Sequence, residues 1–171
     1  AHEFRHTPQR EQIKELIEDS YIGEFKLASL ELYLSRGNSE TPPAMTWASS
    51  RADGGGFLGA LGSHFIDGLR YWFGDVDTVT GRLDTFQPDR IDDSGAIVES
   101  QTDDSFTFTL TFKNGGSATM ICSSAVTPAR GARISVMGSH GTLFAEQNSP
   151  NPAEDGGILG SQNGGPLEAI E

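Results

Sequence analysis

Residues that can do chemistry gather near the middle of the chain. The glycine triplet Gly54–Gly56 precedes a predicted helix, His64 stands two turns into that helix, and Asp67 follows one turn later. Glycine permits positive φ and close approach of the backbone to a ligand. Histidine has an ordinary pKa suited to proton transfer near neutrality, and a nearby carboxylate can fix its tautomer. We therefore expect a site here, with His64 as acid or base and with Gly55, Gly56 and Asp67 close to substrate.

Each of these assignments has a structural alternative. His64 can instead pack between the helix and a sheet, with one ring nitrogen hydrogen-bonded. Asp67 can equally be a surface or capping carboxylate. The spacing alone leaves both alternatives open.

The glycine stretch also matches the bare dinucleotide-binding pattern Gly-x-Gly-x-x-Gly at Gly54, Gly56 and Gly59. That fingerprint must directly follow a buried strand. Here the preceding strand is predicted to end near Leu34, and residues 35–53 form a polar loop that contains prolines. We therefore expect no cofactor-binding residue in this chain, and no useful binding of NAD(P) by the chain alone.

The loop before the triplet holds two further candidates for substrate binding. Trp47 can cover the apolar face of a sugar-like ring, or it can anchor a small hydrophobic cluster. Arg51, like Arg5, can meet an anionic or hydroxylated substrate, although solvated guanidinium groups are the simpler interpretation. Nothing in the spacing of His2 and His6 calls for a metal, so no metal site is expected.

Hydrophobic periodicity predicts the elements that position these residues. The expected helices cover 8–20 and 57–73, and the expected strands cover 24–34, 76–86, 106–112, 118–122, 134–137 and 142–145. In the second helix the core-facing stripe is Leu58, Leu61, Phe65, Leu69 and Trp72. Val79 and Leu83 are in phase within the strand that follows.

The clearest strand alternates large apolar residues with threonines. Its apolar set is Phe106, Phe108, Leu110 and Phe112, and its polar set is Thr107, Thr109 and Thr111. Asn114-Gly115 then gives a strong hairpin signal, and 138–141 predicts a second hairpin turn. The sequence predicts an α+β fold: an open, largely antiparallel sheet with helices packed on one face and the other face free for oligomer contacts.

Composition limits the partners. The net charge of −12 argues against nucleic acid and anionic membrane surfaces, which require basic patches. The acidic stretch 84–104 is interpreted as a solvated loop. The lone Cys122 excludes an internal disulfide, and there is no apolar run of bilayer length or signal-peptide core. These features together predict a cytoplasmic protein.

An ordered set of motifs resembles one known family over residues 1–146. They are His2-Glu3-Phe4-Arg5-x-x-Pro8, Leu16-Ile17, Ile22-Gly23-Glu24, Trp47, Gly54-Gly55-Gly56-x-Leu58, Leu61-Gly62-Ser63-His64-x-Ile66-Asp67-x-Leu69-Arg70-Tyr71-Trp72-x-Gly74, Phe112-x-Asn114-Gly115 and Ile134-x-Val136-x-Gly138-x-x-Gly141-Thr142-Leu143. This set resembles the C-terminal domain of the Gfo/Idh/MocA oxidoreductases, which include glucose–fructose oxidoreductase and inositol dehydrogenase.

The resemblance implies a two-domain parent enzyme. Its N-terminal Rossmann domain would bind NAD or NADP and carry the catalytic lysine. Its C-terminal domain would supply the substrate pocket for a polyol-like small molecule and the contacts of a homo-oligomer. Residues 1–146 would be that second domain, and 147–171 a Gly-, Asn- and Pro-rich loop or tail, cut before the family's C-terminal end.

The resemblance also implies a catalytic role for His64, with one departure. The family usually has an aspartate four residues before the histidine, where this chain has Ala60. On an α-helix positions 60 and 64 share a face, so the chain lacks one pocket carboxylate. Two function classes follow: a substrate domain of a polyol oxidoreductase, or a non-catalytic assembly or ligand-binding domain that has lost the family chemistry.

Overall fold

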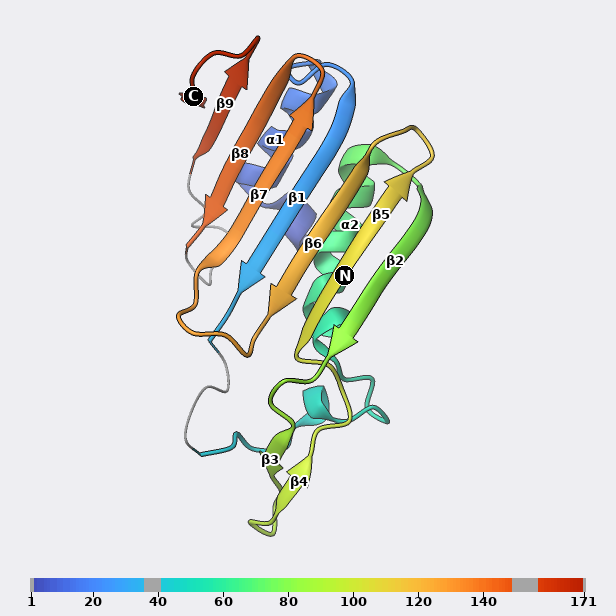
Figure 1. Ribbon diagram of the computed structural model, residues 1–171, viewed down its shortest axis with the longest axis vertical. Helices are drawn as coiled ribbons and strands as arrows, with labels where there is room; N and C mark the ends of the chain where they lie inside the picture. Colours follow the sequence, from blue (N-terminus) through green and yellow to red (C-terminus); the bar gives the residue numbers. More distant parts are fainter. Residues whose placement is uncertain (1, 36–40, 149–156, 171) are drawn as a thin grey trace.

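One eight-stranded open sheet carries the described part of the chain, with helices α1 and α2 behind it (Figure 1). The computed structural model describes residues 2–35, 41–148 and 157–170. The helical elements are η1 (Glu3–His6), α1 (Pro8–Glu18), η2 (Trp47–Ser49), η3 (Leu58–Gly62) and α2 (Ser63–Phe73). The strands are β1 (Phe25–Tyr33), β2 (Val76–Asp84), β3 (Asp89–Ile91), β4 (Ile97–Glu99), β5 (Ser105–Phe112), β6 (Ser117–Ser123), β7 (Gly131–Gly138), β8 (Gly141–Gln147), β9 (Ile158–Gln162) and β10 (Glu168–Ile170).

The sheet has the strand order β10-β9-β8-β7-β1-β6-β5-β2. Strand β1 lies in the middle, antiparallel to β7 and parallel to β6. The remaining neighbours in this sheet are antiparallel. The predicted α+β fold with a largely antiparallel open sheet is confirmed. The parallel pair was not predicted, because strand periodicity carries no information about which distant strand a segment joins.

The helix-facing side of the sheet forms the core. Its alternation in β5 is as predicted, since Phe106, Phe108, Leu110 and Phe112 are all buried. They share one cluster with the buried hydrophobic residues of α1 and α2, which are Ile13, Phe65, Leu69, Trp72 and Phe73. Leu58 and Leu61 pack against this cluster while only partly buried. Each buried large side chain contributes roughly 1.5–3 kcal/mol, so this layer holds α2 in place.

Two large apolar residues of edge strand β2 are exposed. Val79 and Leu83 pair with Leu110 and Phe106, so they are in phase as predicted and point to the helix side of the sheet. They are nevertheless 66% and 54% exposed. Figure 1 shows the reason: α2 lies behind β6 and β5, and β2 stands beyond it at the edge.

Two hairpins agree with the turn signals. Strands β5 and β6 are joined through 113–116, and β7 and β8 through Ser139 and His140. The acidic stretch, by contrast, is more than a loop. Its strands β3 and β4 pair around a turn in which Oδ1 of Asp92 accepts the N–H groups of Ser94 and Ala96. The interpretation of 84–104 as an open loop is wrong there.

The expectation of a loop or tail over 147–171 is also wrong where the chain is described. Strand β8 runs to Gln147, β9 pairs with β8, and β10 pairs with β9. Ile158 is buried, and Gly160 lacks a side chain where Tyr21 and Ile170 pack. The glycine-rich composition does not predict these strands, because β9 and β10 form by pairing with the edge of the sheet at β8 and not through strand propensity of their own. No helix in the described residues is long and apolar enough to cross a membrane.

The helix over 57–73 is not α-helical throughout. It opens with the π-helical turn η3 and becomes α2 only at Ser63. A Cβ on Gly62 would come within 2.7 Å of the Phe106 ring, so glycine lets the widened turn lie on the sheet. A π-helical turn is closed by i→i+5 hydrogen bonds in place of the i→i+4 bonds of an α-helix. Ala60 lies in this turn, whereas His64 lies in α2.

Candidate functional site

A cavity of about 550 Å³ lies at the end of the sheet next to the β3–β4 hairpin. Its walls come from the loop around η2, the start of η3, strand β3 and residues just before β5. The lining side chains that bear on its chemistry are Trp47, Phe57, Ala60, Arg90, Thr102 and Asp103. Trp47 is 59% exposed, so its ring is available to a ligand instead of being packed away.

The glycine triplet builds one wall of this cavity through its backbone. Gly54 and Gly56 have φ of +75° and +123°, which side-chain-bearing residues rarely adopt. Gly55 has its amide on the carbonyl of Ser50, and an added Cβ would lie 2.4 Å from the carbonyl oxygen of Trp47. Gly56 lines the cavity, whereas Gly55 is fixed against η2 behind it. The triplet thus sets the position of Trp47.

Asp103 occupies the N-terminus of the helix. Its backbone carbonyl accepts the Phe57 N–H at 3.1 Å, and its Oδ2 accepts the Leu58 N–H at 2.7 Å. A dinucleotide pyrophosphate would need these same amides, which are what a helix N-terminus offers an anion. A carboxylate already fills that position. Asp103 therefore occupies the amides of Phe57 and Leu58, and the absence of NAD(P) binding by the chain alone stays a prediction.

Arg90 stands in the opposite wall, on β3. Its Nε donates to Oγ of Ser49 at 3.0 Å, and its Nη1 donates to the backbone carbonyls of Gln87 and Asp89. These bonds tie the hairpin to η2 and hold the guanidinium in one orientation. Nη2 makes no hydrogen bond within the described ranges, so it remains a donor for a ligand.

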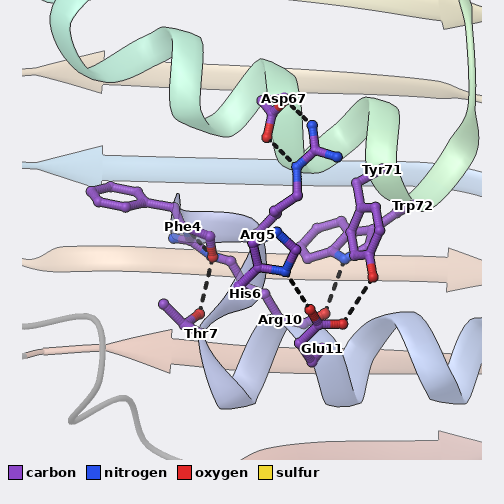
Figure 2. Close-up of polar contacts among 9 residues, drawn as sticks. All are labelled: Phe4, Arg5, His6, Thr7, Arg10, Glu11, Asp67, Tyr71 and Trp72. Atoms are coloured by element: carbon purple, nitrogen blue, oxygen red, sulfur yellow. Dashed lines mark hydrogen bonds and ion pairs between the residues drawn. The ribbon is translucent and has the colours of Figure 1, made fainter. Parts of the chain in front are cut away.

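A second polar region joins η1, α1 and α2 (Figure 2). Arg5 on η1 donates through Nε and Nη2 to the two carboxylate oxygens of Asp67 on α2, with Nε to Oδ2 at 2.6 Å. This pairing lowers the pKa of Asp67, because the charged carboxylate is stabilised by the guanidinium. Asp67, which was predicted to contact substrate, is thus paired with Arg5, for which a solvated guanidinium was the simpler interpretation.

Further bonds close the same region. Glu11 on α1 bonds His6 at 2.7 Å and accepts the hydroxyl of Tyr71 at 2.9 Å. These bonds lower the pKa of Glu11 and raise that of Tyr71. The indole N–H of Trp72 donates to the carbonyl of Arg10 at 3.1 Å. The region fixes η1 and α1 to α2 and leaves little polar capacity for a ligand.

His64 lies at the edge of this polar region. Its ring stacks on Phe4 with centroids 4.2 Å apart, and His2 meets it edge-on at 5.1 Å. Its Nδ1 is buried and has no hydrogen-bond partner among the residues described. Asp67 therefore does not fix its tautomer. Burial lowers the pKa of His64, so the ring is neutral at neutral pH.

The structure thus divides the predicted site residues into two groups. Trp47 and Gly56 line the cavity, while Asp67 belongs to the second region and His64 to its edge. Arg51 is exposed; its backbone N–H donates to Gln101 and its carbonyl accepts the Gly54 N–H, while its side chain does not line the cavity. Sequence reasoning missed Asp103 and Arg90, which it placed in a solvated acidic loop. The available signal was Arg90 itself, a lone cation in that stretch. No cluster of metal-ligating side chains occurs in the described parts of the chain.

Comparison with known proteins identifies the family. The family model described as the GFO/IDH/MocA C-terminal domain matches residues 11–144. The chain belongs to this family. The Gfo/Idh/MocA resemblance inferred from the motifs is therefore confirmed, and with it the assignment of the chain to an oxidoreductase family.

Relatives and solved structures extend this match. A Synechocystis sp. protein described as an uncharacterized oxidoreductase is 30% identical over 144 residues, which are 82% of this chain and 38% of that protein. The crystal structure of an NAD binding oxidoreductase from Klebsiella pneumoniae has a TM-score of 0.86 at 20% identity, covering 99% of this chain and 46% of that one. Levoglucosan dehydrogenase in complex with NADH and L-sorbose gives 0.84 at 19% identity, covering 99% and 46%.

These figures separate what is shared from what is not. The Gfo/Idh/MocA fold extends through β9 and β10, because the structural matches cover nearly the whole chain. The chain spans less than half the length of these relatives.

Proposed function

We propose that this chain is the substrate-binding and oligomerisation domain of an NAD(P)-dependent oxidoreductase acting on a hydroxyl group of a sugar, cyclitol or related polyol. The observation that carries the proposal is the cavity beside the glycine triplet. It combines an exposed indole, a guanidinium donor, a carboxylate and the hydroxyl of Thr102. Aromatic faces suit the apolar faces of sugar rings, and the charged groups suit their hydroxyls. The relative solved with NADH and L-sorbose is consistent with such a substrate.

The proposed chemistry moves a hydride and a proton from the substrate. A nicotinamide held by the dinucleotide-binding domain supplies the hydride acceptor. His64 is proposed to take the hydroxyl proton as the carbinol becomes a carbonyl. Because His64 does not line the cavity, this role requires a substrate whose reacting carbinol extends beyond the cavity to His64. Its lowered pKa keeps the imidazole neutral, and Nδ1 has no competing partner within the described structure. Asp67 is reassigned from substrate contact to positioning η1 against α2.

The direct test uses the protein together with its dinucleotide-binding domain. We expect reduction of NAD or NADP, followed at the nicotinamide absorbance, with at least one member of a panel of sugars and cyclitols. Trp47→Ala should raise KM for that substrate about tenfold or more, because the ring covers it. Arg51→Ala, on an exposed residue outside the cavity, is the matched control and should change little.

The alanine at position 60 is the observation that supports a second candidate function. Loss of the usual carboxylate favours a non-catalytic assembly or ligand-binding domain that retains the fold. That alternative requires no turnover of any panel member by the protein with its dinucleotide domain. Saturable polyol binding without NAD(P) reduction would establish it.

The open face of the sheet is the proposed surface for self-association. It carries Thr107 and Thr109, and the exposed apolar residues Leu27, Ile121 and Leu159 lie on the same side by strand register. Burial of that apolar surface favours a second copy, while the net charge of −12 opposes it. We expect a dimer or larger species in sedimentation velocity at moderate salt. Ile121→Lys should shift it toward monomer, and a strict monomer of the wild type would contradict the proposal.

A further inference from the structure

Two neighbouring aspartates, Asp103 and Asp104, line the cavity, and they differ in burial and in how many hydrogen bonds their carboxylates accept. Asp104 is 5% exposed, its Oδ1 accepts the Phe86 N–H and the Ser105 hydroxyl, and its Oδ2 accepts the Gln87 N–H. Its hydrogen-bonding capacity is used in holding the turn after β2. Asp103 is only half-buried and keeps one oxygen for something else.

That oxygen is Oδ1 of Asp103. Oδ2 is fixed on the Leu58 amide, whereas Oδ1 has no hydrogen-bond partner in 2–35, 41–148 or 157–170. It lies against Gly56, where an added Cβ would come within 2.6 Å of it. Both Gly56 and Asp103 line the cavity. A carboxylate fixed at one oxygen and free at the other is preorganised to accept a hydrogen bond.

The surroundings specify the donor. Ala60 in the same wall presents only a methyl group, so it leaves space beside the carboxylate. The exposed ring of Trp47 offers an apolar platform, and Arg90, which also lines the cavity, keeps Nη2 as a donor. An anionic ligand group would be repelled by Asp103, while a hydroxyl can donate to Asp103 and accept from Arg90. The fitting ligand is therefore a neutral polyol.

From these contacts we infer that Asp103 binds a substrate hydroxyl and determines specificity. The inference rests on the proposed function and adds a residue to it. It also explains how the cavity retains a carboxylate although position 60 has none: the group comes from the segment before β5 in place of the helix.

Asp103→Asn is the sharpest variant. An asparagine carbonyl can still accept the Leu58 N–H, so the helix start is retained, while the amide NH₂ replaces the free acceptor in the cavity. A lost hydrogen bond to a charged group lowers kcat/KM by about ten- to a hundredfold. Asp89→Asn removes the same charge from an exposed residue of β3 and should stay within about twofold of wild type. Thermal unfolding of both variants should match that of the wild type.

Two measurements separate substrate contact from a purely structural role. The first measurement uses monodeoxy analogues of the active polyol, each lacking one hydroxyl. For one analogue, kcat/KM of the wild type should fall well below its value with the parent polyol. For Asp103→Asn, kcat/KM with that analogue should be no lower than with the parent polyol. Adding Ala60→Asp to Asp103→Asn should recover part of kcat/KM, because it returns a carboxylate to the same cavity.

Each outcome has a distinct meaning. An active wild type with Asp103→Asn equally active overturns this inference and leaves the proposed function standing. The inference is also overturned if Asp103→Asn lowers kcat/KM by the same factor with the parent polyol and with every deoxy analogue, since no hydroxyl is then recognised by that carboxylate. If the wild type turns over no polyol, we would titrate the 171-residue chain with levoglucosan and myo-inositol. A shift of the Trp47 indole resonance that Asp103→Asn abolishes would support the contact without turnover, and no shift would overturn it.

Discussion

The two polar regions that flank the η3–α2 helix differ in what their side chains are bonded to. In the η1–α1 region, Arg5 meets Asp67 and Glu11 meets Tyr71, so charged and polar groups satisfy one another. In the cavity, Oδ1 of Asp103 has no hydrogen-bond partner among the described residues, and the ring of Trp47 is 59% exposed. Mutual pairing fixes elements in place, whereas an unfilled preorganised group can bind a ligand. The comparison assigns assembly to the first region and recognition to the second.

The largest expected effect tests the sheet on which both regions depend. Phe108 is buried on β5 and stacks on Phe106 with ring planes 2° apart. Phe108→Ala should lower the free energy of unfolding by about 3–5 kcal/mol, through lost transfer energy and a cavity. Denaturant titration measures it, with Thr107→Ala on the open face as control. A loss below about 1 kcal/mol would mean that this face of β5 is not the core.

His64 tests whether catalysis extends to the edge of the assembly region. In the proposed oxidoreductase, which would join this chain to a dinucleotide-binding domain, His64→Ala should lower kcat by about a hundredfold or more, since general acid–base catalysis contributes about 10²–10⁴-fold. Fold and NADH affinity should not change. His140→Ala, in the exposed β7–β8 turn, is the matched control. A near wild-type rate would make His64 a structural histidine packed on Phe4.

The pH dependence gives His64 a second readout. An imidazole must be neutral to accept a proton, and burial lowers the pKa of His64 below its ordinary value of 6.5. Activity should therefore persist below pH 6.5 and fall only as pH drops through the lowered pKa. That acidic limb of kcat/KM should be absent from the residual activity of His64→Ala.

The sequence predicted the sheet well because alternation reports burial directly. Phe106 to Phe112 and the Asn114-Gly115 turn encode β5 and its hairpin in local residues. β9 was missed because its glycine and serine have low strand propensity, and its order depends on pairing with β8. The local sequence pattern predicts a strand where burial alternates along it. It does not predict a strand that forms only because a neighbouring strand pairs with it.

The site was predicted in part for the same reason. Trp47 and the glycine triplet are conspicuous in the chain, and the structure brings Trp47 and Gly56 to one cavity. Pairing of Arg5 with Asp67 joins residues 62 positions apart, which no spacing rule reveals. Asp103 was assigned to a solvated stretch because its contact with Leu58 joins residues 45 positions apart.

Gly56 sharpens the distinction between backbone scaffold and ligand contact. Gly56→Ala places a side chain at φ +123° and toward Asp103, so it should destabilise the fold by about 1–3 kcal/mol. Gly59 has open space around a Cβ, so Gly59→Ala should be neutral or stabilise by up to about 1 kcal/mol. Chemical denaturation of both variants measures the difference. Equal stabilities would show that the triplet's conformation does not matter.

The smallest expected effect concerns the Arg5–Asp67 pair itself. Arg5 lowers the pKa of Asp67 in the folded chain, so the folded value lies below the unfolded one. The stabilisation is therefore fully present above the unfolded pKa of about 4 and is lost as pH falls through the folded value. Asp67→Asn should lower the thermal unfolding midpoint by a few degrees at pH 7. This gap between the midpoints of wild type and variant should close as the pH falls. Asp75→Asn is the matched control, because Asp75 pairs with Arg70 on the surface, where ion pairs contribute little. A gap that stayed constant down to low pH would show that the Asp67 charge does not hold η1 on α2, and the assembly role of that region would fail with it.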